Sequence, residues 1–194
     1  MNSFLHRKER VILSAIEIID ELGIQGLSTR AIATRQGISE GTLFRHFKSK
    51  NEIILAVLDH FSQYDADIFQ SVRLKGLRTK EAITFLIDSY AIYYENYPAI
   101  TALTQIYGVL SSEPEFEDKV HNILFSRQNF LTEVIERGQK LGEIKEDLDS
   151  AILADIIWGA FSSICLSWRM NDRNFSLREK ILTALDMLLE AFCL

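Results

Sequence analysis

Basic side chains crowd one short stretch of the sequence, GISEGTLFRHFKSKNE, which runs from Gly37 to Glu52. Lysine and arginine there could neutralise nucleic-acid phosphates, and an arginine could instead bind a guanine through two hydrogen bonds. Glu40 has two open roles. Its charge could stabilise a helix amino terminus by about 0.3–1 kcal/mol, which we favour, or it could accept a hydrogen bond from cytosine. The basic residues are Arg45, His46, Lys48 and Lys50.

The charge of the chain is divided unevenly along its length. The net charge of −6 would by itself argue against a nucleic-acid partner. Residues 1–50, however, hold 8 lysines and arginines against 5 aspartates and glutamates, or +3, and the remainder holds 13 against 22, or −9. We therefore expect a basic amino-terminal unit that meets a polyanion and an acidic body that does not.

Helical periodicity runs through almost the whole sequence, and no convincing alternating strand appears. The pattern predicts an all-α fold of about nine helices, the first over residues 7–22 and ending at Gly23. The third is predicted to run from the cap Ser39 to Phe47. Further signals predict the other ends: Ser28, Ser49 with Glu52, Thr79, Asp149 and Ser176 as helix caps, and Gly76, Tyr97 and Gly142 as breaks.

The first three predicted helices have the arrangement of a helix-turn-helix, with Gly37 in the turn. Ile38, Leu43 and Phe47 would attach the third helix, which leaves its polar residues free to reach base edges. A three-helix packing unit with a solvated basic face fits the spacing equally well. We divide the chain into a DNA-binding domain (1–50), a linking helix (51–75) and a helical carboxy-terminal domain (76–194).

The segment LSTRAIATRQGISEGTLFRHFKSKNEIILAV, which begins at Leu27, resembles the amino-terminal domain of the tetracycline-repressor (TetR) family of transcription regulators. The resemblance covers about the first third of the chain at the level of motifs. Three positions depart from the family pattern: Glu40 where lysine is frequent, Phe44 for a frequent tyrosine, and Arg45 where histidine is common. The residues expected to face DNA are Thr29, Ser39, Glu40, Gly41, Thr42, Phe44, Arg45, His46, Lys48 and Lys50.

The acidic body offers a surface for a second copy of the chain. A DNA-binding domain this small gains affinity and a defined register when two copies bind two half-sites, so we expect a homodimer. Small and apolar residues of the eighth and ninth predicted helices resemble the dimerising four-helix bundle of the family, although they could simply be core residues. The residues expected at this interface are Ile156, Gly159, Ser163, Leu166, Leu185 and Leu189.

Aromatic residues recur at helical spacing in the same body, which on general grounds is more often core than pocket. The family resemblance implies a cavity for an inducer. Few charges interrupt the pattern, so we expect a small, largely apolar or aromatic effector held by one or two tyrosine hydrogen bonds. The residues expected to line the pocket are Tyr90, Tyr93, Tyr94, Tyr107, Phe125, Trp158, Phe161 and Cys165.

Together these patterns indicate a DNA-binding regulator. The family resemblance implies that residues 76–194 form a ligand-binding and dimerisation domain. It also implies a ligand-responsive protein, most simply a repressor that leaves a palindromic operator when its effector binds. The alternative is a DNA-binding regulator under protein or redox control. An enzyme is not expected, because the four histidines are scattered and form no catalytic cluster. We expect no cofactor and no metal, since Cys165 and Cys193 lack CxxC spacing. We expect a cytoplasmic protein without a membrane span, because the apolar run Ile156–Trp168 is too short.

Overall fold

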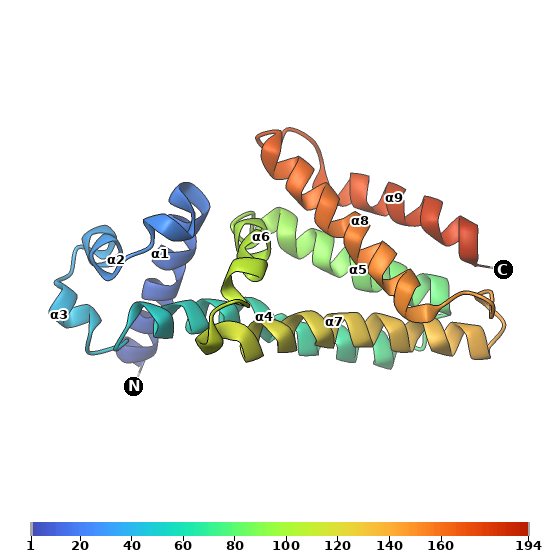
Figure 1. Cartoon of the computed structure of the whole chain (residues 1–194), viewed down its shortest axis with the longest axis horizontal. Coiled ribbons are helices and arrows are strands. Elements are labelled where there is room, and N and C mark those ends of the chain that lie inside the picture. The colour runs from blue at the N-terminus through green and yellow to red at the C-terminus, as the bar shows by residue number, and fades with distance from the viewer. Residues whose placement is uncertain (1, 194) are drawn as a thin grey trace. The chain divides into compact units, whose positions relative to one another are not determined.

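The computed structural model of the chain describes residues 2–193, with side chains from residue 7 onward. Nine α-helices and no strand occur in this range, which confirms the all-α prediction; an isolated bridge pairs Ile144 with Cys193. The helices are α1 (Asn2–Gly26), α2 (Thr29–Gln36), α3 (Glu40–Leu43), α4 (Lys50–Lys75), α5 (Thr79–Asn96), α6 (Ile100–Leu110), α7 (Pro114–Lys140), α8 (Ser150–Met170) and α9 (Leu177–Phe192) (Figure 1).

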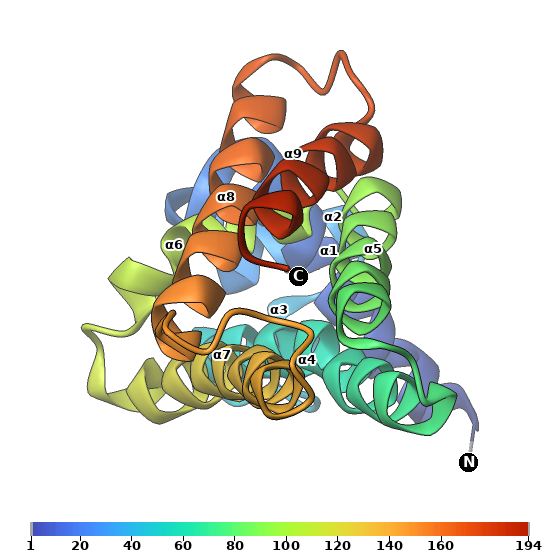
Figure 2. The same cartoon turned by 90° about the vertical axis from the view of Figure 1, so that its right-hand side faces the viewer.

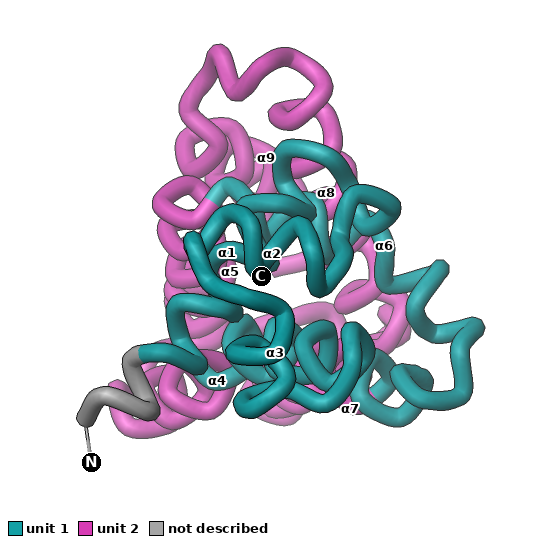
Figure 3. The backbone as a smooth tube through the Cα atoms, turned by 90° about the vertical axis from the view of Figure 1, so that its left-hand side faces the viewer, with its two compact units in different colours: residues 1–63, 98–121 teal, residues 64–97, 122–194 magenta. Residues whose placement is uncertain are grey.

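The helices form two compact units, shown in teal and magenta in Figure 3. Unit 1 comprises Met1–Gln63 and Pro98–His121, and unit 2 comprises Tyr64–Tyr97 and Asn122–Leu194. The helix α4 belongs to both, because its residues 50–63 lie in unit 1 and its residues 64–75 lie in unit 2. These units are defined by packing, whereas the three predicted domains are defined by expected roles, so the division by role stays a prediction.

In unit 1, α1 packs against α2 and α6, and α2 packs against α3. The predicted packing residues Leu43 and Phe47 are buried, as is Ile32 of α2. Burial of each such side chain removes apolar surface from water and contributes on the order of 1.5–3 kcal/mol. Gly23 leaves helical geometry (φ 69°, ψ 179°), as its predicted position at a helix end requires, and three further residues complete α1.

In unit 2, α9 lies against both α5 and α8 (Figure 2). The start of α5 and the end of α7 approach closely, because Gly138 carries no side chain. A Cβ atom at position 138 would lie 2.5 Å from Cγ2 of Thr79, which real Cβ atoms essentially never do. This contact requires glycine at position 138 for as long as threonine stands opposite it.

The predicted helix caps are confirmed at several positions. The side chains of Ser28, Ser39, Asp149 and Ser176 accept backbone hydrogen bonds at the starts of their helices. The Thr79 prediction is wrong: Arg78 is the N-cap of α5, and the Thr79 N–H donates to Glu143 Oε2 at 2.8 Å. The third helix is also shorter than predicted, since α3 ends at Leu43 and turns follow it.

Among the helices of residues 2–193, α8 is long and apolar enough to cross a membrane by length and composition alone, with a mean hydropathy of 1.6. A core helix of a globular protein passes the same test. One face of α8, which includes Leu153, Ile157 and Phe161, is buried in unit 2. Only 28% of its most apolar segment is buried, however, so much of an unusually apolar helix remains exposed.

Candidate functional site

A tight turn at Gly37 joins α2 to α3. Gly37 has left-handed backbone angles (φ 63°, ψ 33°), which a residue with a side chain adopts only at a cost. Its N–H donates to the Thr34 carbonyl at 3.1 Å, and the Ile38 N–H donates to the Ala33 carbonyl at 3.0 Å. Ser39 then caps α3 by accepting the Thr42 N–H. These local bonds fix the direction in which α3 leaves α2.

Glu40 is held in place by a residue of the preceding helix. The Thr29 hydroxyl donates a hydrogen bond of 2.8 Å to Glu40 Oε2, and this contact is partly buried. The carboxylate also lies in the first turn of α3, where a negative charge is favourable. Both observations favour the stabilising role of Glu40 over its alternative role, which is to accept a hydrogen bond from a cytosine of the operator.

Most side chains expected to face DNA are accessible. Phe44 is 46% exposed, and Arg45 Nη2 lies 3.4 Å from Thr42 Oγ1. Ser49 caps α4 as predicted, since its Oγ accepts the Glu52 N–H, but the capping box is incomplete, because Glu52 Oε2 accepts the N–H of Lys48 rather than that of Ser49. Within the described residues the exposed members are Ser39, Gly41, Phe44, Arg45 and Lys48, and the partly exposed members are Thr29, Glu40, Thr42 and Lys50.

His46 differs from the other members of this set, because its side chain is only 8% exposed. Burial lowers its pKa, and the neighbouring cations Arg7, Arg45 and Lys8 lower it further. The ring is therefore neutral near pH 7 and supplies no fixed charge to a phosphate.

Two arginines of α1 lie beside His46, and the sequence analysis did not assign them to the site. Arg7 and Arg10 line a groove of about 320 Å³ together with Gln36, Thr42 and His46. The Gln36 amide donates to the Arg10 carbonyl at 2.8 Å, so α1 is held against α2 at this point. The charge count of residues 1–50 contained these arginines, but only the folded chain brings them to the turn.

Five of the predicted pocket residues form an aromatic cluster in unit 2. Tyr90 and Trp158 pack edge to face with centroids 5.2 Å apart, as do Tyr94 and Phe161 at 5.1 Å. Tyr93 continues the cluster, with its centroid 6.1 Å from that of Tyr94. Such pairs add about 0.5–1.5 kcal/mol each beyond the burial of apolar area.

The other three predicted pocket residues are placed differently. Tyr107 belongs to unit 1, and Phe125 of α7 is 48% exposed. Cys165 is buried on α8, and burial raises the pKa of its thiol to about 12. A thiol held protonated in this way reacts slowly with oxidants, which weighs against redox control through Cys165.

A buried ion pair borders the aromatic cluster, and the sequence analysis missed it. Arg127 of α7 binds Asp65 of α4 through two parallel hydrogen bonds, Nε to Oδ2 at 2.9 Å and Nη2 to Oδ1 at 3.0 Å. The Tyr90 hydroxyl donates to Asp65 Oδ1 at 2.8 Å, and Arg127 Nη1 donates to the Tyr94 hydroxyl at 3.2 Å. A signal existed: Arg127 stands four residues from both Ile123 and Leu131 on a buried face.

Trp158 presents a second polar feature of the cluster. Its indole Nε1 is buried and has no hydrogen-bond partner among the described residues. An unsatisfied buried donor costs about 1–3 kcal/mol, so each instance in a folded protein requires an explanation. A ligand atom that accepts this hydrogen bond would supply one.

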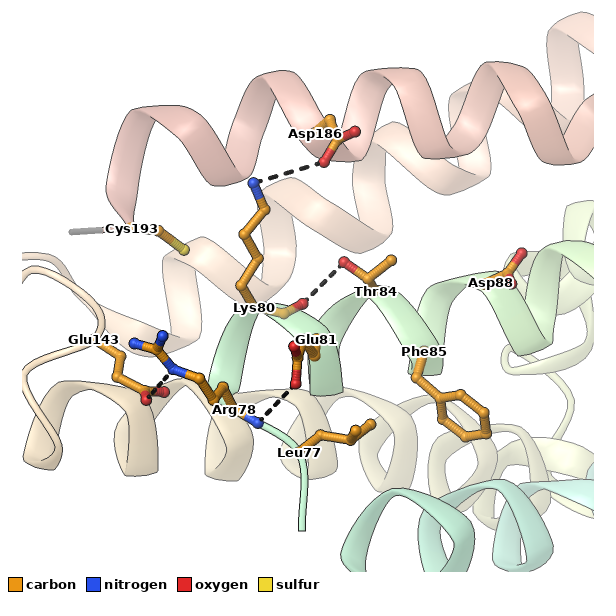
Figure 4. Close-up of a pocket in the computed structure, with 10 residues that line it drawn as sticks. All are labelled: Leu77, Arg78, Lys80, Glu81, Thr84, Phe85, Asp88, Glu143, Asp186 and Cys193. Atoms are coloured by element: carbon orange, nitrogen blue, oxygen red, sulfur yellow. Dashed lines mark hydrogen bonds and ion pairs between the residues drawn. The ribbon is translucent and has the colours of Figure 1, made fainter. Parts of the chain in front are cut away.

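A separate groove of about 760 Å³ opens in unit 2 beside α5 and α9 (Figure 4). Its lining is mixed rather than aromatic, and its charges are paired. Lys80 points to Asp186 at 3.8 Å, and Arg78 binds Glu143 at 3.1 Å. Hydrogen bonds from Thr79 and then Arg78 lower the pKa of Glu143 to about 2. The groove therefore differs in chemistry from the predicted apolar pocket.

The outer face of α8 is apolar and exposed. Ile156 and Leu166, both predicted at a dimer interface, are 44% and 45% exposed, and Gly159 and Ser163 between them are exposed as well. Ile152 and Met170 extend this surface to the two ends of the helix. We call these six residues the α8 face.

Leu185 and Leu189, the remaining residues predicted at the dimer interface, are buried rather than exposed. They are 3% and 0% exposed within a single chain. Both point into unit 2, where α9 packs against α5 and α8. They belong to the core of the protomer, which was the alternative left open by the sequence.

Two sequence models of known families match the chain. The model of bacterial regulatory proteins of the tetR family matches residues 11–57, which contain α2, α3 and the turn at Gly37. The model of the YsiA-like protein C-terminal region matches residues 70–191. The first covers residues 11–50 of the predicted DNA-binding domain, and the second covers more than half of the chain.

Known proteins resemble the chain over most of its length. The fatty acid metabolism regulator protein of Bacillus subtilis strain 168 is 26% identical over 169 residues, 87% of this chain and 86% of that protein. The crystal structure of FadR from Bacillus subtilis in complex with stearoyl-CoA has a TM-score of 0.81 at 25% identity, covering 93% of this chain and 97% of that one.

A third similarity concerns the fold alone. The ketosteroid transcriptional regulator KstR2 of Mycobacterium tuberculosis has a TM-score of 0.84 at 20% identity, covering 97% of this chain and 95% of that one. The matched sequence models, the helix-turn-helix and the all-helical fold agree with one another. The chain therefore belongs to the tetR family of bacterial regulatory proteins and is a transcriptional regulator with a carboxy-terminal region of the YsiA-like type.

Proposed function

We propose that the protein is a repressor that binds a palindromic operator as a homodimer and releases it when a long-chain acyl-CoA binds. The observation that carries the proposal is the capped turn at Gly37, which presents α3 and, in the segment directly after it, the exposed side chains of Phe44, Arg45 and Lys48. A helix positioned by its apolar side with polar residues outward is what entry into the major groove requires. The protein acts in the cytoplasm, where DNA and acyl-CoA are both present, and without turnover.

The proposed DNA contacts divide by chemistry. Arg45 is placed to bind guanine or a phosphate, and Lys48 and Lys50 neutralise phosphates at the flank of α3. Ser39 and Thr42 offer hydroxyls, and Gly41 lets the backbone approach closely. Phe44 offers an apolar surface for a thymine methyl or a sugar. The structure supports adding Arg7 and Arg10, because they line a groove with Thr42 of α3.

The proposed dimer forms through the α8 face. An exposed apolar stripe along a helix is costly in water, and Gly159 and Ser163 leave room for a second helix to approach. In a two-fold dimer the same face of a second copy covers it, so each copy supplies what the other needs. The membrane-like hydropathy of α8 is then explained by two protein surfaces, one inside the protomer and one between protomers.

The proposed effector class follows from the relatives and from the aromatic cluster of unit 2. The relative from Bacillus subtilis regulates fatty acid metabolism, and the FadR structure contains stearoyl-CoA. An acyl chain is largely apolar and therefore suits the apolar surroundings of the aromatic cluster around Tyr94 and Phe161. A ligand that binds more tightly to the conformation with low operator affinity shifts the population toward that conformation. Operator binding is then weakened by at most the difference between the free energies with which the ligand binds the two conformations.

The first experiment measures binding to DNA fragments from around the protein's own gene by fluorescence anisotropy over a series of salt concentrations. We expect sequence-selective, salt-sensitive binding that Arg45→Ala plus Lys50→Ala abolishes. Arg137→Ala plus Lys140→Ala removes the same charge from unit 2 and serves as the control. Stearoyl-CoA should then release the bound DNA. Operator binding that the Arg45 and Lys50 substitutions leave unchanged would refute the operator proposal. Failure of every acyl-CoA to release the DNA would refute the effector class.

A further inference from the structure

The arginine inside unit 2 is neutralised before any ligand arrives. The side chains of Arg127 and Asp65 are only 7% and 9% exposed, and two parallel hydrogen bonds join them. The Tyr90 hydroxyl donates to the same carboxylate, and the Arg127 guanidinium lies 4.9 Å from the centroid of the Tyr90 ring. The pair therefore has no net charge and well-satisfied geometry.

The donor next to this pair is satisfied by nothing in the described chain. Trp158 packs on Tyr90, whose hydroxyl binds Asp65, so the indole borders the ion pair through one shared neighbour. Its buried Nε1 needs an acceptor but is not a cation. An uncharged carbonyl oxygen satisfies this donor without bringing a charge into the cluster.

Resting on the proposed function, we propose that Asp65 and Trp158 make the effector site select an uncharged acyl carbonyl, such as that of a thioester, over a free carboxylate. The carbonyl oxygen accepts a hydrogen bond from Trp158 Nε1. A free carboxylate is rejected because Asp65 already neutralises Arg127, so a second carboxylate would bring an uncompensated negative charge into the buried cluster. The regulator thereby responds to the activated acyl group and ignores the free fatty acid.

The position of Asp65 gives this selectivity a route to DNA binding. Asp65 belongs to α4, and the same continuous helix begins at Lys50, one of the proposed phosphate contacts. Its partner Arg127 belongs to α7, 62 residues further along the chain. A ligand bound beside the pair therefore acts on the helix that leads directly to the DNA-binding segment.

The test compares decanamide with decanoate, which share a chain and differ in the charge of the head group, on the full-length protein by calorimetry. Decanoyl-CoA is titrated in parallel. We expect wild type to bind decanoyl-CoA, and to bind decanamide about tenfold or more tightly than decanoate. Asp65→Asn leaves Arg127 charged but not neutralised, so it should invert the preference. Asp67→Asn, an exposed carboxylate on the same helix, should change nothing.

Two further variants keep the test decisive if Asp65→Asn folds poorly. The double variant Asp65→Leu plus Arg127→Met replaces the pair by apolar groups, a change that folded proteins tolerate. It should bind decanamide and still reject decanoate. Trp158→Phe should weaken decanamide about tenfold, whereas Trp168→Phe should not, because Trp168 Nε1 already donates to the Phe175 carbonyl.

The outcomes separate the two proposals. Binding of decanoyl-CoA together with an unchanged preference in Asp65→Asn would overturn the selectivity and leave the effector class standing. Loss of decanoate discrimination in the apolar double variant would overturn it as well. If no acyl compound binds wild type or any variant, the effector class and the selectivity both fall.

Discussion

The Thr29 hydroxyl donates a 2.8 Å hydrogen bond to the Glu40 carboxylate and so joins the first turn of α2 to the first turn of α3. The two residues are 11 positions apart, and the turn at Gly37 brings them together. Two contacts therefore fix the angle between the two helices of the DNA-binding motif. The glycine turn connects the end of α2 to the start of α3, and this bond connects the start of α2 to the start of α3.

Breaking this bond should lower the stability of unit 1 and weaken binding to every DNA sequence equally. A double-mutant cycle with Thr29→Val and Glu40→Ala should give a coupling free energy of about 0.5–1.5 kcal/mol in urea unfolding. If Glu40 instead read a cytosine, Glu40→Ala would relax sequence preference at one base pair, while Thr29→Val would not.

Removing Arg7 and Arg10 should reduce the salt dependence of operator binding. Each phosphate contact contributes about 0.9 to the slope of log K against log salt, so the double alanine variant should lose about 1.8 if both contact phosphates. The measurement is the same anisotropy titration over salt. Alanine at Arg137 and Lys140 serves as the control, and an unchanged slope would remove α1 from the interface.

Acid should destabilise the protein partly through His46. Burial and neighbouring cations lower its pKa in the folded state, so the unfolded chain binds the proton more readily. The stability that depends on neutral His46 is fully present above its ordinary pKa of 6.5 and is lost as the pH falls through the lowered value. Thermal melting from pH 7.5 to 5 should therefore be flatter for His46→Gln.

His60 must be separated from this effect, because burial lowers its pKa in the same direction. His60→Gln should also give a flatter melting profile than wild type, and the double variant His46→Gln plus His60→Gln should give a flatter profile than either single variant. His121, an exposed residue of α7, serves as the control. A wild-type slope in His46→Gln would show that its ring is not kept neutral in the folded protein.

Glu143 should stabilise unit 2 at neutral pH but not in strong acid. Its folded pKa of about 2 lies below its ordinary value of 4.5, so its contribution is present above pH 4.5 and is lost as the pH falls toward 2. Glu143→Gln should melt at a lower temperature than wild type at pH 7, and the difference should shrink in that window. Glu146→Gln, in the same loop, should match wild type throughout.

A charge on the α8 face should prevent dimerisation without unfolding the protomer. Ile156 is exposed in the single chain, so Ile156→Glu should leave the helical circular dichroism spectrum intact. Analytical ultracentrifugation should then find a monomer that binds the operator far more weakly. Leu74→Glu places the same change on an apolar residue that is 76% exposed on α4 and serves as the control.

Local chain chemistry explains which parts of the fold could be predicted. Ser39, Asp149 and Ser176 cap their helices because each side chain bonds to a backbone group two or three residues ahead, which the sequence displays directly. The Thr79 prediction failed because Glu143, 64 residues away, provides the acceptor. A distant partner cannot be recognised from neighbours in the chain.

The candidate site shows the same division. The aromatic residues Tyr90, Tyr94 and Trp158 stood out by helical spacing and do pack together. Asp65 and Arg127 did not, because a charged residue reads as exposed until its partner is known. Leu185 was predicted at the dimer interface but is buried within its own chain. Periodicity identifies an apolar face but does not say whether the same chain or a second copy covers it.

The contact between Gly138 and Thr79 limits the order in which this chain can change over generations. Enlarging residue 138 first would force its new carbon into the threonine, so that lineage would have to separate the start of α5 from the end of α7. Removing the threonine side chain first opens the space, after which alanine at 138 becomes acceptable. Descendants can thus pass from one pair to the other along a single path, and a comparison of close relatives should contain the intermediate with glycine at 138 and a smaller residue at 79.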